Sequence, residues 1–157
     1  MPIVFSRSGT VTADTQWDFD KIDLSPFRRL TVEVKLTANA AAAAGDTLNV
    51  YLQERKQGNA WSDRAALVQL IGTMLSGEVR QLNLSAEGPL SDTEESYEPS
   101  GSTGGSRLTA GLVINGPFAP NYRDFGVGMA TAWRFDLDIT NVTGPSFPLK
   151  ITVYGDE

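Results

Sequence analysis

The chain has 157 residues, of which 41% are hydrophobic and 20% charged, a composition typical of one globular domain. It contains no histidine and no cysteine, which excludes Ser-His-Asp and Cys-His catalysis, thiolate zinc and histidine-ligated metals from its own residues. The net charge of −6 disfavours electrostatic binding to nucleic acid or to anionic membranes. We therefore predict one soluble domain over residues 1–157 that is not an enzyme and contacts neither nucleic acid nor membrane.

Alternation of apolar and polar residues predicts strands that bury one face. The clearest run has Leu30, Val32, Val34 and Leu36 on one face and polar side chains between them. The same period of two recurs in three further segments, 48–53, 134–139 and 147–154. Each segment is rich in β-branched or aromatic residues, which favour strands.

Weaker patterns fill much of the remaining chain. Strand-like runs lie at 3–6, 9–13, 17–22, 79–84 and 108–114. The run 65–75 fits either a short helix or a buried strand, and we favour a strand because Gly72 and Gly77 punctuate it. The alanine-rich run 38–45 is too short to be a stable helix alone, so we expect a connection there.

The stretch 85–106 differs in composition from the rest of the chain. It carries five acidic residues and then a Gly/Ser/Thr run, with almost no apolar side chain to bury. This predicts a long, exposed loop that is mobile at least in part. One-sided strands elsewhere predict an all-β fold of about eight or nine strands, in two antiparallel sheets packed face to face. The order of the strands does not follow from alternation.

Two pairs of carboxylates are spaced for chemistry. Asp136 and Asp138 share one face of a strand roughly 6.6 Å apart, as do Asp18 and Asp20. An inverting glycosidase needs two carboxylates roughly 6.5–9.5 Å apart. Because every half-buried strand turns polar residues outward, we interpret both pairs as solvated faces rather than catalytic sites.

The acidic loop contains four candidate calcium ligands, Asp92, Glu94, Glu95 and Glu98. These residues lack the spacing and the terminal glutamate of an EF-hand loop, so we interpret them as a solvated run of charge. We predict no metal ion and no cofactor.

Aromatic residues give the candidate surface contacts. Trp17 and Trp133 lie within the alternating pattern, which predicts that they are buried, whereas Trp61 follows a turn-like segment and is the better surface candidate. A short terminal strand gains most from pairing with a partner, so we expect residues 1–13 to dock. The candidate partner contacts are Ile3, Val4, Phe5, Trp61 and Tyr122.

Two stretches carry a resemblance to a known group of proteins. The first is 48–54 (LNVYLQE), followed by Gly58 and by the Trp-Ser-Asp of 61–63. The second is 133–139 (WRFDLDI), followed by a Gly-Pro-Ser-Phe turn and a last strand, 149–155 (LKITVYG). Together they resemble small virion proteins of tailed bacteriophages, most of all capsid decoration (cement) proteins. The resemblance covers about 30–155 but not the acidic loop, and the Arg55-Lys56 pair departs from the usual turn.

The resemblance implies a jelly-roll-like β-sandwich on the outer surface of a phage head, produced in the host cytoplasm. Its implied partner is the major capsid protein, and its implied assembly is a homo-oligomer, with a trimer favoured. Two alternatives remain open at this stage: a tail or neck component, and a carbohydrate-binding or receptor-binding β-sandwich module. A hydrolase that uses a carboxylate pair ranks last.

Overall fold

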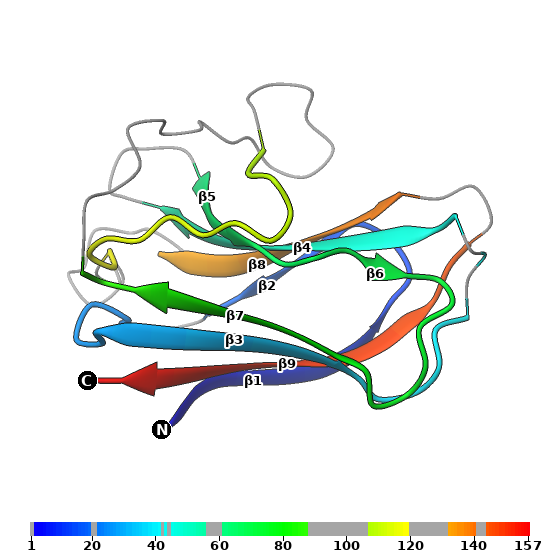
Figure 1. Cartoon of the computed structure of the whole chain (residues 1–157), viewed down its shortest axis with the longest axis horizontal. Helices are drawn as coiled ribbons and strands as arrows, with labels where there is room; N and C mark the ends of the chain where they lie inside the picture. The colour runs from blue at the N-terminus through cyan, green and yellow to red at the C-terminus, as the bar shows by residue number, and fades with distance from the viewer. Residues whose placement is uncertain are drawn as a thin grey trace.

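The computed structural model describes residues 2–19, 22–41, 43, 45–55, 61–87, 107–119, 132–140 and 144–157. This part of the chain forms nine strands and no helix (Figure 1). The strands are β1 (Ile3–Val11), β2 (Thr15–Asp18), β3 (Arg29–Leu36), β4 (Thr47–Arg55), β5 (Trp61–Ala66), β6 (Leu70–Ile71), β7 (Val79–Ser85), β8 (Trp133–Thr140) and β9 (Phe147–Asp156).

The strands form two antiparallel sheets that pack face to face, which confirms the predicted all-β sandwich. One sheet has the order β1-β9-β3-β7, and the other has the order β2-β8-β4-β5, with β6 paired to β4. Most connections carry the chain from one sheet to the other. This order is that of a jelly roll, two Greek keys wound together.

Strand β3 shows how the sequence specifies this arrangement. It pairs with β7 on one side and β9 on the other along nearly its whole length. Leu30, Val32, Val34 and Leu36 point inward and are at most 1% exposed. Because a slip of one residue would turn this apolar set to water, the alternation fixes the register as well as the strand.

Aromatic side chains fill the space between the sheets. The rings of Phe5 and Phe19 stack with their centroids 4.3 Å apart, and Phe135 lies 5.1 Å from Phe19. Trp17 and Trp133 are 5% and 0% exposed, as their place in the alternation predicts. The core therefore ties the N-terminal strands to β8.

The N-terminal segment differs from expectation. Residues predicted as two short pieces form one strand, β1, which pairs with β9 from Ile3 to Val11, with an irregularity between Ile3 and Phe5. The strand is therefore already part of this chain's own sheet, and among the described strands only its outer edge has no neighbour. Strand propensity alone does not predict one continuous strand here, because the contacts that stabilise β1 come from β9, more than a hundred residues away.

Two other segments are less regular than predicted. Within the run 65–75, β5 ends at Ala66 and only Leu70–Ile71 returns to strand, as β6. The run 108–114 makes a single isolated bridge, between Val113 and Ala65. Gly111 has a φ of 88°, a conformation that does not continue a strand.

Part of the predicted loop lies outside the described residues, since 88–106 are not among them. None of the described segments forms a helix long and apolar enough to span a membrane.

Candidate functional site

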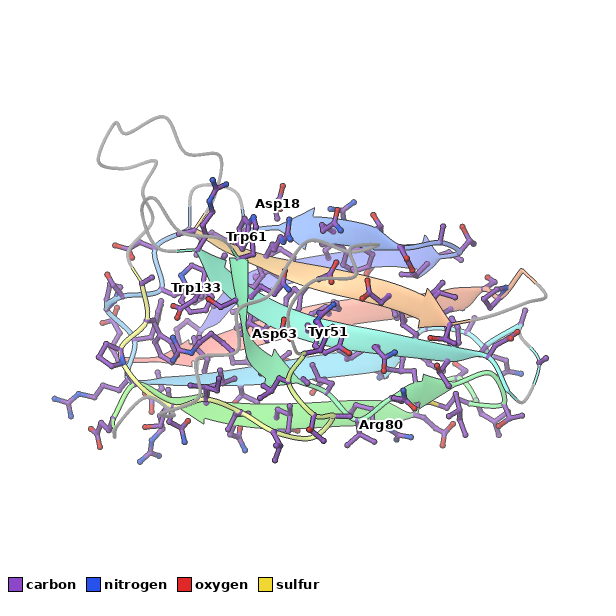
Figure 2. The ribbon with its side chains drawn as sticks, turned by 90° about the horizontal axis from the view of Figure 1, so that it is seen from above. Asp18, Tyr51, Trp61, Asp63, Arg80 and Trp133 are labelled. Carbon is purple, nitrogen blue, oxygen red and sulfur yellow. The ribbon has the colours of Figure 1, made fainter. Side chains whose placement is uncertain are left out.

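A cluster of charged side chains lies on the outer face of the β2-β8-β4-β5 sheet. Asp136 faces Tyr51 across β8 and β4, and Asp63 faces Gln53 across β5 and β4, so these side chains share one surface. Figure 2 looks onto this surface, with Tyr51 and Asp63 near its centre. Asp63 and Asp136 are 1% and 0% exposed. The interpretation of Asp136 as part of a solvated face is therefore wrong.

Arg107 is the reason that carboxylates can be buried there. Its Nε lies 3.0 Å from Asp63 Oδ2, its Nη2 3.1 Å from Asp136 Oδ2 and its Nη1 2.9 Å from Asp138 Oδ2. Its guanidinium lies 3.6 Å from the centroid of the Tyr51 ring. One planar cation thus binds three carboxylates and stacks on an aromatic face, geometry that arginine provides and lysine does not. These five residues form the Arg107 cluster.

Further donors complete the bonding of the buried carboxylates. Gln16 Nε2 donates to Asp136 Oδ1 at 3.0 Å, and Gln53 Nε2 donates to Asp63 Oδ1 at 2.8 Å. The backbone N–H of Leu108 donates to Asp63 Oδ2 at 3.0 Å. Both oxygens of Asp63 and of Asp136 therefore accept hydrogen bonds. A glycosidase acid lies in an apolar pocket, whereas these carboxylate oxygens are bonded to a guanidinium, to side-chain amides and to a backbone N–H.

Burial raises the pKa of the Tyr51 phenol above 10.0, while the neighbouring positive charge of Arg107 acts in the opposite direction. The phenol is therefore neutral at ordinary pH. It serves as the surface on which the guanidinium stacks.

A second arginine, Arg64, holds the segment 107–119 at one end of the sandwich. Arg64 Nη1 lies 2.9 Å from Glu54 Oε2, and the two side chains are 2% and 4% exposed. The same guanidinium donates to the carbonyls of Ile114, Gly116 and Pro117. Arg64 and Arg107 together fasten the segment 107–119 to the sheet.

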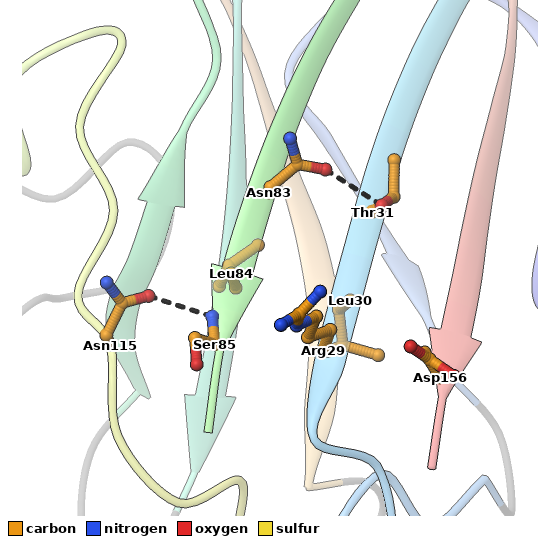
Figure 3. A pocket seen from close by; sticks show the side chains of 8 residues that line it. All are labelled: Arg29, Leu30, Thr31, Asn83, Leu84, Ser85, Asn115 and Asp156. Atoms are coloured by element: carbon orange, nitrogen blue, oxygen red, sulfur yellow. Dashed lines mark hydrogen bonds between the residues drawn. The ribbon is translucent and has the colours of Figure 1, made fainter. Parts of the chain in front are cut away.

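The other sheet carries a polar groove where β3 begins and β7 ends, shown in Figure 3. It has a volume of about 450 Å³. Its lining residues are Arg29, Leu30, Thr31, Asn83, Leu84, Ser85, Asn115 and Asp156. We call it the β3–β7 groove.

Three of the predicted partner contacts lie at the start of β1 and differ in exposure. Ile3 is 59% exposed and is available to a partner, whereas Phe5 is 9% exposed and stacks on Phe19 in the core. Val4 is partly buried and packs against the same core.

Trp61 is less accessible than predicted. It begins β5, is 9% exposed and lies beneath Arg134, whose guanidinium carbon is 4.2 Å from the centroid of its ring. Little of the Trp61 side chain is therefore accessible, and its role as a partner contact stays a prediction. Tyr122 lies outside the described residues.

The remaining acidic candidates are not brought into a metal site. Asp18 ends β2 and is exposed, and Asp20 and the acidic residues at 92–98 lie outside the described ranges. Among the described residues, no group of three or more acidic side chains is arranged to hold a metal ion. In the Arg107 cluster, the position between the carboxylates holds the guanidinium instead.

No protein-family model, no curated protein and no solved structure matches this chain.

Proposed function

We propose that this chain is a structural virion protein, a capsid decoration subunit that binds the outer surface of a tailed-phage head and stabilises the shell. Its direct partner is the major capsid protein, and it binds as a homo-oligomer, with a trimer favoured. It acts through its surfaces and performs no chemistry.

One observation carries most of this proposal. The residues that resemble the phage proteins converge on a single interlocked network: Gln53 bonds to Asp63, Arg134 Nε donates to Gln53 Oε1 at 2.8 Å, and Arg134 stacks on Trp61. The motif therefore has a structural purpose, holding β4, β5 and β8 in register. A family of structural subunits is expected to share residues that hold its strands together, and the residues of this network do that.

The fold and the buried charges also support the proposal. Jelly rolls are common in capsid and lectin domains, an analogy of fold that does not by itself assign function. The carboxylates best placed for catalysis are bound by Arg107 and by amide donors, which leaves them poorly suited to proton transfer.

Adding the purified chain to phage heads that lack it tests the proposal. We expect saturable co-sedimentation with the heads and a higher temperature of head disassembly. Failure to co-sediment with any assembled head would contradict shell binding. Binding to isolated tails but not to heads would move the chain to the tail or neck.

A further inference from the structure

The β3–β7 groove is built from two rows of side chains that cross the outer face of its sheet. In one row Thr31 lies between Asn83 on β7 and Tyr154 on β9. In the next row Arg29 lies between Ser85 and Asp156. Directly opposed side chains in neighbouring antiparallel strands have Cβ atoms about 4.5–5.5 Å apart, so these groups are close enough to contact one small ligand.

Internal hydrogen bonds fix the orientation of both amides in the groove. Asn83 Oδ1 accepts from Thr31 Oγ1 at 2.8 Å, and Asn115 Oδ1 accepts from the backbone N–H of Ser85 at 2.8 Å (Figure 3). Each carbonyl oxygen is occupied, so each NH₂ group is the part left to bond with something else. Within the described chain, neither NH₂ group has a partner.

The two charged side chains of the groove have opposite sign. Arg29 and Asp156 face each other across β3 and β9, and neither forms an ion pair or a side-chain hydrogen bond with the described residues. The groove therefore offers donors at Arg29, Asn83 and Asn115 and an acceptor at Asp156, with no net charge. The chain as a whole carries −6, which further disfavours an anionic ligand.

We propose that the β3–β7 groove binds a neutral saccharide through vicinal hydroxyl groups. A hydroxyl both donates and accepts, so it can donate to Asp156 while accepting from an arginine or an amide. A pair of adjacent hydroxyls matches a surface that presents both kinds of group at fixed positions. The volume of about 450 Å³ lies within the usual range for small-molecule sites. Tyr154 places an aromatic side chain beside Thr31, at the end of one row.

Isosteric substitutions test this site without disturbing the sheet. Asn83→Asp and Asn115→Asp keep the carbonyl oxygen that accepts from Thr31 or Ser85 but replace the NH₂ donor by a second oxygen. Asn39→Asp is the matched control, because Asn39 Oδ1 also accepts from a backbone N–H, that of Ser76, and Asn39 does not line the groove. Each protein is applied to an array of neutral and acidic saccharides, and binding of the strongest neutral saccharide is then measured by calorimetry.

We expect binding to at least one neutral saccharide, weakened about tenfold or more by either groove variant and unchanged by Asn39→Asp. Absence of binding to every neutral saccharide would overturn the proposal. So would a preference for acidic saccharides, or binding that the groove variants leave intact. Saccharide binding does not depend on shell binding, so the co-sedimentation experiment and this one can fail separately.

Discussion

Arg107 combines three roles that are usually divided among several residues. It neutralises the carboxylates of Asp63, Asp136 and Asp138, covers the Tyr51 ring and anchors the chain where the described segment 107–119 begins. Its side chain is 25% exposed, so the ion pairs are only partly shielded from water. Removing the cation would leave carboxylates facing one another in a site of low accessibility, which is costly.

Replacing Arg107 by methionine should therefore lower the free energy of unfolding by about 2–3 kcal/mol. Urea denaturation at neutral pH measures the change. Arg29→Met is the matched control, because Arg29 is exposed and forms no ion pair with the described residues, and we expect it to change stability by less than about 0.5 kcal/mol. Equal effects from the two substitutions would show that the Arg107 cluster contributes no specific stability.

Tyr51 predicts a dependence of stability on alkaline pH. Its pKa is raised above 10.0 in the folded chain, chiefly by burial, so the folded state retains a proton that the unfolded state releases. Stability from this group is complete below about pH 10 and falls as pH rises toward the folded pKa. Above pH 10, the free energy of unfolding of Tyr51→Phe should fall less steeply with pH than that of the unchanged chain. Parallel pH profiles for the two proteins would argue against a buried phenol.

These side chains also show what sequence reasoning can reach at this scale. The alternation correctly turns Asp136 and Asp138 toward the outer face, but burial of that face depends on a residue from elsewhere. Arg107 lies 44 positions from Asp63 and directly follows a Gly/Ser run that predicts nothing but loop. The one available signal was the density of acidic residues on the predicted strands, and it does not specify a contact.

At the scale of elements, the strand edges decide what can pair with this chain. Just before β7, the carbonyl of Glu78 accepts from the N–H of Leu36 on β3. At the end of β7, the N–H and C=O of Ser85 bond instead with Asn115 and Gly116, outside the sheet. Residues of β7 therefore alternate between bonding to β3 and pointing to the outer edge. By this alternation the N–H of Gln81 points outward, and that of Leu82 points toward β3.

Proline substitutions test this alternation directly. Gln81→Pro removes an N–H that no internal strand uses, so we expect a loss of about 1 kcal/mol or less. Leu82→Pro removes a bond to β3 and should cost about 3 kcal/mol or more beyond the loss measured for Leu82→Ala. Thermal unfolding of the three variants gives the comparison. Similar losses for the two prolines would mean that the assigned direction of the β7 groups is wrong.

Gly155 marks a close approach between β9 and the loop before β3. A Cβ at this position would lie 2.5 Å from Cδ1 of Phe27, so either the ring or the strand must move. Gly155→Ala should cost about 1–3 kcal/mol, and much less in a Phe27→Ala background. A double-mutant cycle by urea denaturation measures the coupling. Additive effects of Gly155→Ala and Phe27→Ala would show that the Phe27 ring can move aside without cost.

The sequence predicts long regular elements better than short ones. β3, β4, β8 and β9 follow their alternation because each buries one apolar face in the core. β6 has two residues, too few for any period, and it forms only because β4 offers a free edge at Thr47 and Leu48. The groove could not be predicted from the sequence either, since it joins β3, β7 and β9 with Asn115. The position of Asn115 depends on the hydrogen bond that its Oδ1 accepts from the N–H of Ser85.

At the scale of the whole molecule, the fold separates an apolar interior from two different outer faces. The face of β2-β8-β4-β5 is covered by the segment that Arg64 and Arg107 fasten. The outer face of β1-β9-β3-β7 carries the groove. Such a division suits a subunit that meets a shell with one surface and the surroundings with another.

If the chain is a component of the phage head, as we propose, its copy number in purified particles gives the most direct test. Quantitative mass spectrometry of intact particles, relative to the major capsid protein, gives this number. We expect a copy number comparable to that of the major capsid protein, as a subunit that decorates the whole lattice requires. Its absence from purified particles would contradict the claim.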